Sequence, residues 1–173
     1  MNRRLIKKEE WTFFFFYFLY NYIYKYLIYI IMESVNFSWN EFENLSNFSA
    51  HQIEYNNILF PSCEHLYHYL RYSDTEIQNK ILSAKSPYLV HKISQEYKSQ
   101  QIENFSDIKI KIMKKIFQLK LEQHRDVYLT LINTEKKLII KQHPLDYFWW
   151  VWSDNSWKNI MWKLWEEVRS ELI

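Results

Sequence analysis

Glycine is missing from this sequence, which has 173 residues and no Gly at all. An average protein contains roughly 7% Gly, so about a dozen would be expected here. The absence excludes Gly-rich phosphate-binding loops and the G-x-S-x-G nucleophile elbow, because both depend on backbone conformations that larger residues avoid. Cysteine is nearly absent as well. Cys63 is the only one, so the chain has no intrachain disulfide and no Cys-based zinc motif.

A strong charge of either sign is also lacking. The chain has 22 Lys and Arg against 20 Asp and Glu, and these residues are scattered along the sequence. A net charge of +2 gives no reason to infer a nucleic-acid partner. His124 and His143 show no recognisable metal-ligand spacing, so the sequence predicts no metal and no cofactor. Hydrophobic residues make up 48% of the chain, which is typical of a globular protein and argues against disorder.

Long apolar runs are confined to residues 11–32, WTFFFFYFLYNYIYKYLIYIIM. A helix of this length would span about 30 Å of hydrocarbon, with the upstream basic residues held in the cytoplasm. Lys25 in the middle would cost about 2.5–3.5 kcal/mol on insertion scales, and many of the apolar positions are Tyr. Three interpretations stay open: translation that truly starts at Met32, a membrane anchor, or a buried or disordered extension. We therefore expect a cytoplasmic protein, with membrane attachment only if residues 11–32 are translated.

Residues 33–173 predict one α+β domain, preceded by the hydrophobic extension 1–32. Residues 37–48 look irregular or form a short strand, and Asn56-Asn57 predicts a hairpin turn within 53–60, because Asn tolerates positive φ. The pattern then predicts five or six helices and a small antiparallel sheet. The helices are expected from Ser62, after Ser73-Asp74, from Pro87, over 106–124, over 126–133 and from near Ser156, with a strand at 137–141.

Glu64, His68 and Arg71 follow one another at i, i+4 and i+7 and should share one face of the helix that starts at Ser62. Glu64 lies in the first turn, where the helix dipole favours a negative charge. From spacing alone, the simplest interpretation of this trio is surface electrostatics. His65 alone is most often an ordinary hydrogen-bonded histidine.

Five short motifs in order resemble the YbiA-like, or NADAR, family. They are SNFSA (46–50), FPSCEHLYHYLRY (60–72), SAKSP (83–87), KIMKKIFQLKLEQH (111–124) and DYFWWVWSDNSWKNIMWKLWEEVR (146–169). Their order and spacing are similar to the family pattern from Phe37 to Leu172. The family's second motif runs P-S/T-x-E-H-x-Y-Q, and its later ones run D-x-x-W-G-x-G and G-x-N-x-L-G. The resemblance implies a mostly helical single domain of the YbiA-like type.

The resemblance implies an N-glycosidase that cleaves the bond between ribose and a base in a nucleotide-type substrate. Family substrates include riboflavin-pathway intermediates and ADP-ribose-linked compounds. It gives Glu64 the catalytic role of stabilising positive charge at the sugar or activating water. It also implies a catalytic role for Asp146, which would contribute to the same pocket. It also implies substrate-binding roles for five residues: Asn47, His65, Arg71, Trp149 and Asn159. The alternatives are a non-catalytic nucleotide or ADP-ribose binding module and a membrane-anchored interaction protein.

The missing glycines and the abundant tryptophans have one common explanation. Six of the eight tryptophans lie within residues 146–165. On the family pattern, Trp stands where Gly is expected at five positions: Trp39, Trp150, Trp152, Trp157 and Trp162. UGA is read as Trp in one variant genetic code and as Gly in another, so we hypothesise that this chain is a translation with the wrong code. Peptide mass spectrometry of the natural protein would test this, and Trp at 150 and 157 would end the hypothesis.

Three departures from the family pattern do not involve tryptophan. Lys141 stands where Glu is common, Phe105 where Trp is common, and Ser94-Gln95 where a Gly-Arg pair is common. Because a carboxylate and a cation are exchanged for other groups, the resemblance leaves the exact substrate open. Glu64 itself is retained, which favours the enzyme interpretation.

Overall fold

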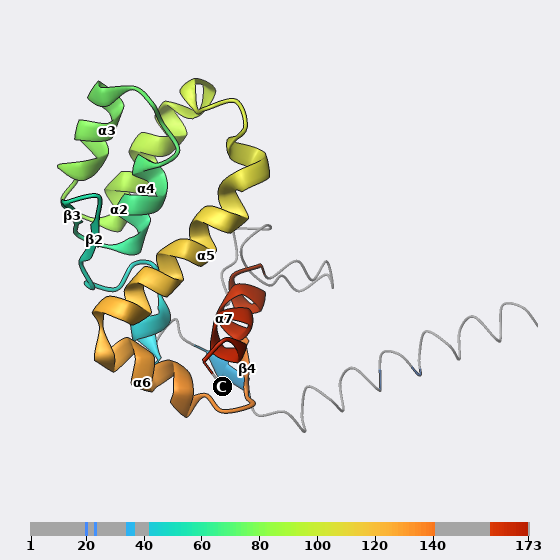
Figure 1. The fold of residues 1–173 in the computed structure, drawn as a ribbon. Helices are drawn as coiled ribbons and strands as arrows, with labels where there is room; N and C mark the ends of the chain where they lie inside the picture. The colour runs from blue at the N-terminus through green and yellow to red at the C-terminus, as the bar shows by residue number, and fades with distance from the viewer. Residues whose placement is uncertain (1–19, 21–22, 24–33, 37–41, 141–159, 173) are drawn as a thin grey trace, which may run out of the picture.

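The computed structural model describes residues 20, 23, 34–36, 42–140 and 160–172 (Figure 1). Its elements follow in chain order: β1 (Ser34–Asn36), η1 (Glu43–Leu45), β2 (Ile53–Tyr55), β3 (Ile58–Phe60), α2 (Cys63–Tyr69), α3 (Thr75–Leu82), α4 (Pro87–Glu96), η2 (Lys98–Gln100), α5 (Phe105–Gln123), α6 (Arg125–Asn133), β4 (Leu138–Ile140) and α7 (Ile160–Ser170). The predicted α+β class, with six helices and a small antiparallel sheet in this part of the chain, is confirmed. Among the described residues, no helix combines the length and the apolarity that crossing a membrane requires.

The predicted hairpin forms between β2 and β3, which pair antiparallel with Ile53 opposite Phe60. Asn56 and Asn57 make the turn with φ of 50° and 62°, the left-handed region that Asn tolerates better than most residues. Both Ile53 and Phe60 are fully buried, so the hairpin turns one face to the core. The turn therefore brings the chain to Ser62, the residue that precedes α2.

Helices α3 and α4 start where the sequence predicts, and a side chain caps each of them. The Asp74 carboxylate accepts hydrogen bonds from the backbone N–H groups of Glu76 and Ile77, at 2.8 and 3.1 Å. Ser86 caps α4 in the same way, and Pro87 follows it in the first turn. A small cluster of buried apolar side chains joins these two helices to the end of α2: Tyr72, Ile77, Ile81 and Val90.

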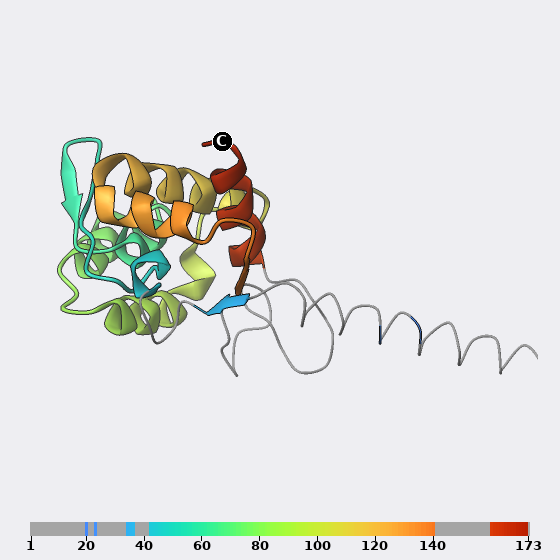
Figure 2. The same cartoon turned by 90° about the horizontal axis from the view of Figure 1, so that it is seen from below.

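The long helix α5 carries the main core. Figure 1 shows it running diagonally across the domain, with α3 and α4 near one end and α6 and α7 near the other. Phe117 of α5 stacks on Trp165 of α7, with ring centroids 4.0 Å apart and planes 8° apart. The Trp165 indole N–H donates to the carbonyl of Leu45, so this pair also fixes the segment before β2. Figure 2 shows α5 and α6 side by side, with the β2–β3 hairpin at the left end of the pair and α7 at the right.

One strand pair differs from the predicted antiparallel sheet. The predicted strand at 137–141 forms as β4, but it pairs parallel with β1, Val35 lying opposite Ile139. Parallel strands need a long crossover, and here nearly the whole domain lies between the two strands in sequence. Periodicity describes each strand alone, so it does not reveal such a distant partner.

The buried thiol of Cys63 gives a direct test of this core. Cys63 is 1% exposed, and burial raises the pKa of its thiol. A buried, protonated thiol is a poor nucleophile. We expect a thiol-reactive dye to label the native chain at least about 100-fold more slowly than the urea-unfolded chain, because labelling waits for opening of the core. Equal rates in the two states, followed by absorbance, would contradict the described packing.

Candidate active site

Glu64 is a buried carboxylate in the first turn of α2. Only 7% of the residue is exposed, and its backbone N–H donates to the carbonyl of Asn47 at 3.3 Å. His68, one turn further along α2, donates from Nε2 to Glu64 Oε1 at 2.9 Å. The simple interpretation of surface electrostatics is therefore wrong for this pair, because both side chains lie inside the protein.

Helix α4 packs against the face of α2 that carries Glu64. His91 of α4 places its Nδ1 atom 4.0 Å from Glu64 Oε1, and its ring meets the His68 ring edge-on with centroids 5.9 Å apart. His91 is half-exposed, whereas His68 and Glu64 are buried. This cluster was not predicted, since His91 lies 27 residues after Glu64 and only the packing of α4 on α2 brings them together.

Arg71 lies on the same side, just beyond the end of α2. Its Nε donates to Gln101 at 3.0 Å and its Nη1 donates to Ser94 of α4 at 2.8 Å. The guanidinium also lies over the Phe105 ring, 5.4 Å from the centroid. Arg71 is 8% exposed, and among the described residues no carboxylate forms an ion pair with it. The site thus holds a buried cation whose described hydrogen-bond partners are neutral.

Asn47 borders Glu64 through the backbone contact and is 2% exposed. Its side-chain N–H donates weakly to the Met113 sulfur at 3.5 Å. Its Oδ1 atom is buried and has no hydrogen-bond partner among the described residues. Buried polar atoms are nearly always paired in native proteins, so an unpaired acceptor beside a candidate catalytic carboxylate points to a ligand or a water.

Lys120 fixes the segment around Asn47, residues 44–49. This α5 residue is fully buried, and its Nζ donates to the carbonyls of Asn44 and Ser46 and to the hydroxyl of Ser49. Burial lowers the pKa of Lys120. Sequence reasoning missed this role, because a Lys within a charged helix normally points to solvent.

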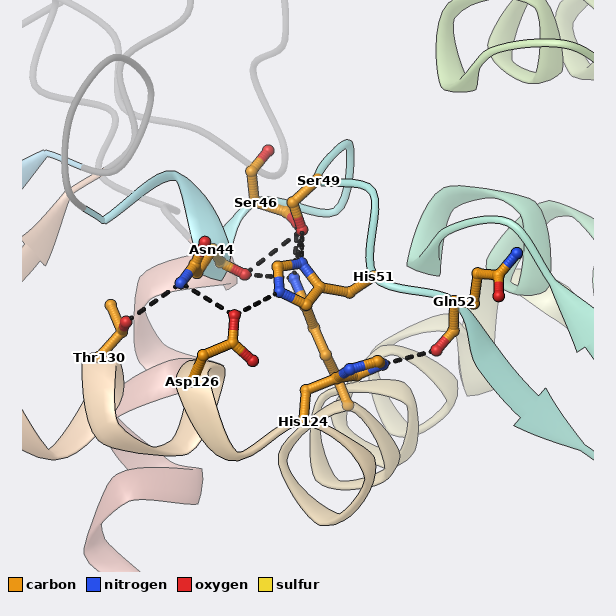
Figure 3. A network of polar contacts seen from close by, with 9 residues as sticks. Asn44, Ser46, Ser49, His51, Gln52, His124, Asp126 and Thr130 are labelled. Carbon is orange, nitrogen blue, oxygen red and sulfur yellow. Dashed lines mark hydrogen bonds and ion pairs between the residues drawn. The ribbon is translucent and has the colours of Figure 1, made fainter.

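A second polar network fixes the same segment to α6 (Figure 3). Asn44 donates to Asp126 and to Thr130, both at 3.3 Å, and His51 Nε2 lies 2.8 Å from the Asp126 carboxylate. The hydrogen bond from His51 lowers the pKa of Asp126.

On the other side of the segment His124 lies 2.6 Å from the carbonyl of Gln52. The loop that presents Asn47 is therefore held by α5 and α6 together.

His65 has both ring nitrogens occupied within the protein. Nε2 lies 3.0 Å from the carbonyl of Ala84, which only accepts, so Nε2 carries a proton. Nδ1 lies 2.8 Å from the Ser62 hydroxyl, which donates to it in the neutral tautomer. Burial lowers the pKa of His65 and favours this neutral form. Ser62 precedes α2 as predicted, but its hydroxyl is directed to His65 and makes no capping hydrogen bond.

Three predicted site residues, Asp146, Trp149 and Asn159, lie outside the described residues. Of the five tryptophans assigned to Gly positions, only Trp162 is described. It packs partly against the core from α7, and its indole Nε1 is buried with no partner in the described part of the chain. A buried donor without an acceptor typically costs about 1–3 kcal/mol. The hypothesis of a wrong genetic code stays a prediction at all five positions.

An open hollow of about 540 Å³ lies elsewhere, against the β2–β3 hairpin. It is lined by hairpin side chains together with Gln123 and His124, and Glu64 is not part of it. Its lining is exposed apart from the half-buried His124 and carries no buried charged group, whereas Glu64 and Arg71 are buried. We therefore place the candidate site at Glu64, where the burial of charge needs an explanation.

The family model of the NADAR domain matches residues 34–173, most of the chain. The chain belongs to the NADAR domain family. The family predicted from the five motifs is thereby confirmed.

Curated relatives of this NADAR protein carry enzyme names. N-glycosidase YbiA of Escherichia coli (strain K12) is 23% identical over 133 residues, 77% of this chain and 83% of the relative. N-glycosidase Npun_R5314 of Nostoc punctiforme is 25% identical over 137 residues, 78% of this chain and 88% of the relative. The predicted enzyme class, a hydrolase of N-glycosyl bonds, is confirmed at the level of these names, which do not identify a substrate for this chain.

A longer relative is the riboflavin biosynthesis protein VVA0006 of Vibrio vulnificus (strain YJ016), which is 28% identical over 145 residues. The matched region is 82% of this chain but only 40% of that protein. The NMR structure of YbiA from E. coli superposes with a TM-score of 0.74 at 22% sequence identity, covering 81% of this chain and 84% of that one. The YbiA-like fold is therefore confirmed.

Proposed function

We propose that this NADAR protein hydrolyses the bond between ribose and a base in a small nucleotide-type substrate, with Glu64 as the catalytic carboxylate. The observation that carries the proposal is the buried Glu64 side chain, fixed by His68 and flanked by the unpaired acceptor of Asn47. The names of the relatives support the bond type. A riboflavin-pathway intermediate or an ADP-ribose-linked compound is the substrate class that the family resemblance favours.

Cleavage of an N-glycoside passes through a transition state with positive charge at C1 of the ribose. The leaving base takes the electron pair of the C1–N bond and acquires a proton. Water supplies the oxygen that bonds to C1 and loses a proton. A carboxylate beside C1 stabilises the developing charge and accepts the water proton, and in a buried site this interaction is stronger than in water. Glu64 is suited to both roles because His68 holds it in one orientation.

Asn47 and Arg71 supply substrate contacts in this proposal. The free Oδ1 of Asn47 accepts a hydrogen bond from a ribose hydroxyl. The Arg71 guanidinium has five N–H donors, and its described hydrogen bonds use only Nε and Nη1, so it retains donors for a phosphate. Both ring nitrogens of His65 are hydrogen-bonded, to the Ser62 hydroxyl and the Ala84 carbonyl. In this proposal His65 therefore supports the site by fixing the start of α2. Asp146, Trp149 and Asn159 keep the roles that the resemblance implies.

The test is release of free base from a panel of ribosyl substrates, measured by chromatography with and without the purified protein. The panel contains phosphorylated ribosyl pyrimidines of the riboflavin pathway and ADP-ribose-linked bases. At least one is expected to yield free base and free sugar in equal amounts. If ADP-ribose bound tightly while no member of the panel was cleaved, the binding-module alternative would replace the proposal.

Arg71 should distinguish phosphorylated from unphosphorylated substrates. Replacing Arg71 with Gln removes the charge but keeps an N–H donor for Ser94 or Gln101. We expect kcat/KM for the phosphorylated substrate to fall about 10–200-fold, equivalent to about 1.5–3 kcal/mol for a charged hydrogen bond. The matching unphosphorylated nucleoside should change much less. An equal loss on both substrates would show that Arg71 has a structural role alone.

A further inference from the structure

Three potential metal ligands converge between α2 and α4. Glu64, His68 and His91 each present one donor atom, and the three donors lie within 4.8 Å of one another. Glu64 and His68 stand one turn apart on α2, a spacing that places both donors on one face. The third donor comes from the neighbouring helix, so two rigid elements hold the set. Among the described residues, no other group of His, Cys, Asp and Glu meets this criterion.

The donor set suits zinc better than a hard cation. Two imidazoles and one carboxylate are a known zinc ligand combination, whereas Ca²⁺ and Mg²⁺ prefer six or more oxygen ligands. Three protein ligands also leave a coordination position open, as in catalytic or exchangeable sites. Access exists because the His91 side chain is 49% exposed, while those of Glu64 and His68 are 9% and 4% exposed. The His68 and Glu64 donors are already 2.9 Å apart, whereas His91 Nδ1 lies 4.0 Å from Glu64 Oε1. Ligation of one ion therefore requires the His68–Glu64 hydrogen bond to be replaced by bonds to the ion and the His91 ring to move closer.

His68 stands at the last position of the second family motif. The motif P-S/T-x-E-H-x-Y-Q ends in Gln, where this chain has His68. An amide is a poor zinc ligand and an imidazole is a good one. His91 then completes a set that neither α2 nor α4 provides alone. With His in place of Gln at position 68, the neighbour of Glu64 can bind a metal ion together with the carboxylate.

We propose that Glu64, His68 and His91 bind one Zn²⁺ ion reversibly. Because the ion occupies the Glu64 carboxylate, zinc and substrate exclude each other, and zinc inhibits the enzyme. The exclusion rests on the proposed function, whereas zinc binding does not. Arg71 lies just beyond the end of α2 and carries a positive charge, which limits the affinity and keeps the site exchangeable.

Zinc binding is measured on the full chain without a His tag, by equilibrium dialysis against ZnCl₂ and by the visible absorption of bound Co²⁺. One equivalent of zinc and a four-coordinate cobalt spectrum are expected, with no competition from excess Mg²⁺. The His91→Ala and His68→Gln variants should each lose at least about 100-fold in affinity. His124→Ala is the matched control, because it removes a half-buried histidine outside the cluster and should bind zinc like the unmodified chain.

His91 decides the outcome, because it is half-exposed and its replacement leaves the core intact. Unchanged zinc affinity in His91→Ala, or a loss of equal size in His124→Ala, would overturn the proposed site. Zinc binding without turnover of any substrate would leave the metal site standing and remove the proposed function. Turnover that is insensitive to zinc at saturating concentration, with one zinc bound at this cluster, would overturn the exclusion.

Discussion

Replacing Glu64 with Gln is expected to lower kcat about 10²–10⁴-fold on the best ribosyl substrate, the range typical of a removed acid–base group. Gln has nearly the shape of Glu and keeps an oxygen to accept the hydrogen bond from His68 Nε2. The variant therefore loses the negative charge but little packing. KM should change far less than kcat, because the charge acts mainly on the cation that develops in the transition state.

The control for this variant is Glu122→Gln, an exposed position on α5 that should leave kcat unchanged. Thermal unfolding of both variants should lie close to that of the unmodified chain, which separates a chemical effect from misfolding. A loss of kcat below about threefold in a folded Glu64→Gln protein would show that another group carries the chemistry.

Replacing Lys120 with Met is expected to destabilise the fold by about 3 kcal/mol or more, a large share of the stability of an ordinary domain. The Lys120 ammonium group donates to the carbonyls of Asn44 and Ser46 and to the Ser49 hydroxyl. Met fills a similar volume but leaves these acceptors buried without their donor. Urea unfolding measures the difference, and Lys115→Met on the exposed side of α5 is the matched control.

The same variant has a pH signature. Burial lowers the pKa of Lys120 in the folded chain below its ordinary value of 10.5. Between these two pKa values the unfolded chain binds more protons, so the free energy of unfolding contributed by Lys120 rises with pH. The stability gap between the unmodified chain and Lys120→Met should therefore widen as pH rises toward about 10. A gap that narrows over this range would mean that the folded-state pKa is not lowered.

Local signals in the sequence predicted most of the local structure. The Asn56-Asn57 turn, the helix start after Ser73-Asp74 and the helix start at Pro87 each depend on a few neighbouring residues, so they can be predicted from the sequence directly. The helix over 106–124 was favoured over a strand because the apolar spacing continued beyond its alternating start, and α5 occupies almost that range.

Long-range contacts account for what the sequence did not reveal. The pairing of β1 with β4, the burial of Lys120 under Ser46 and the approach of His91 to Glu64 each join residues far apart in the chain. Periodicity assigned Lys120 to a helix, but it did not show that this position is buried or that three acceptors surround the ammonium group. Similarly, the spacing of Glu64 and His68 predicted that they share a helix face. It did not reveal that α4 packs against this face and buries it.

The most direct measurement is a crystal structure of the Glu64→Gln variant with an uncleaved ribosyl substrate. We expect C1 of the ribose to lie about 3–3.5 Å from the side chain of residue 64, with Arg71 turned toward the phosphate. A substrate seated instead in the open hollow beside His124 and the β2–β3 hairpin, away from residue 64, would contradict it.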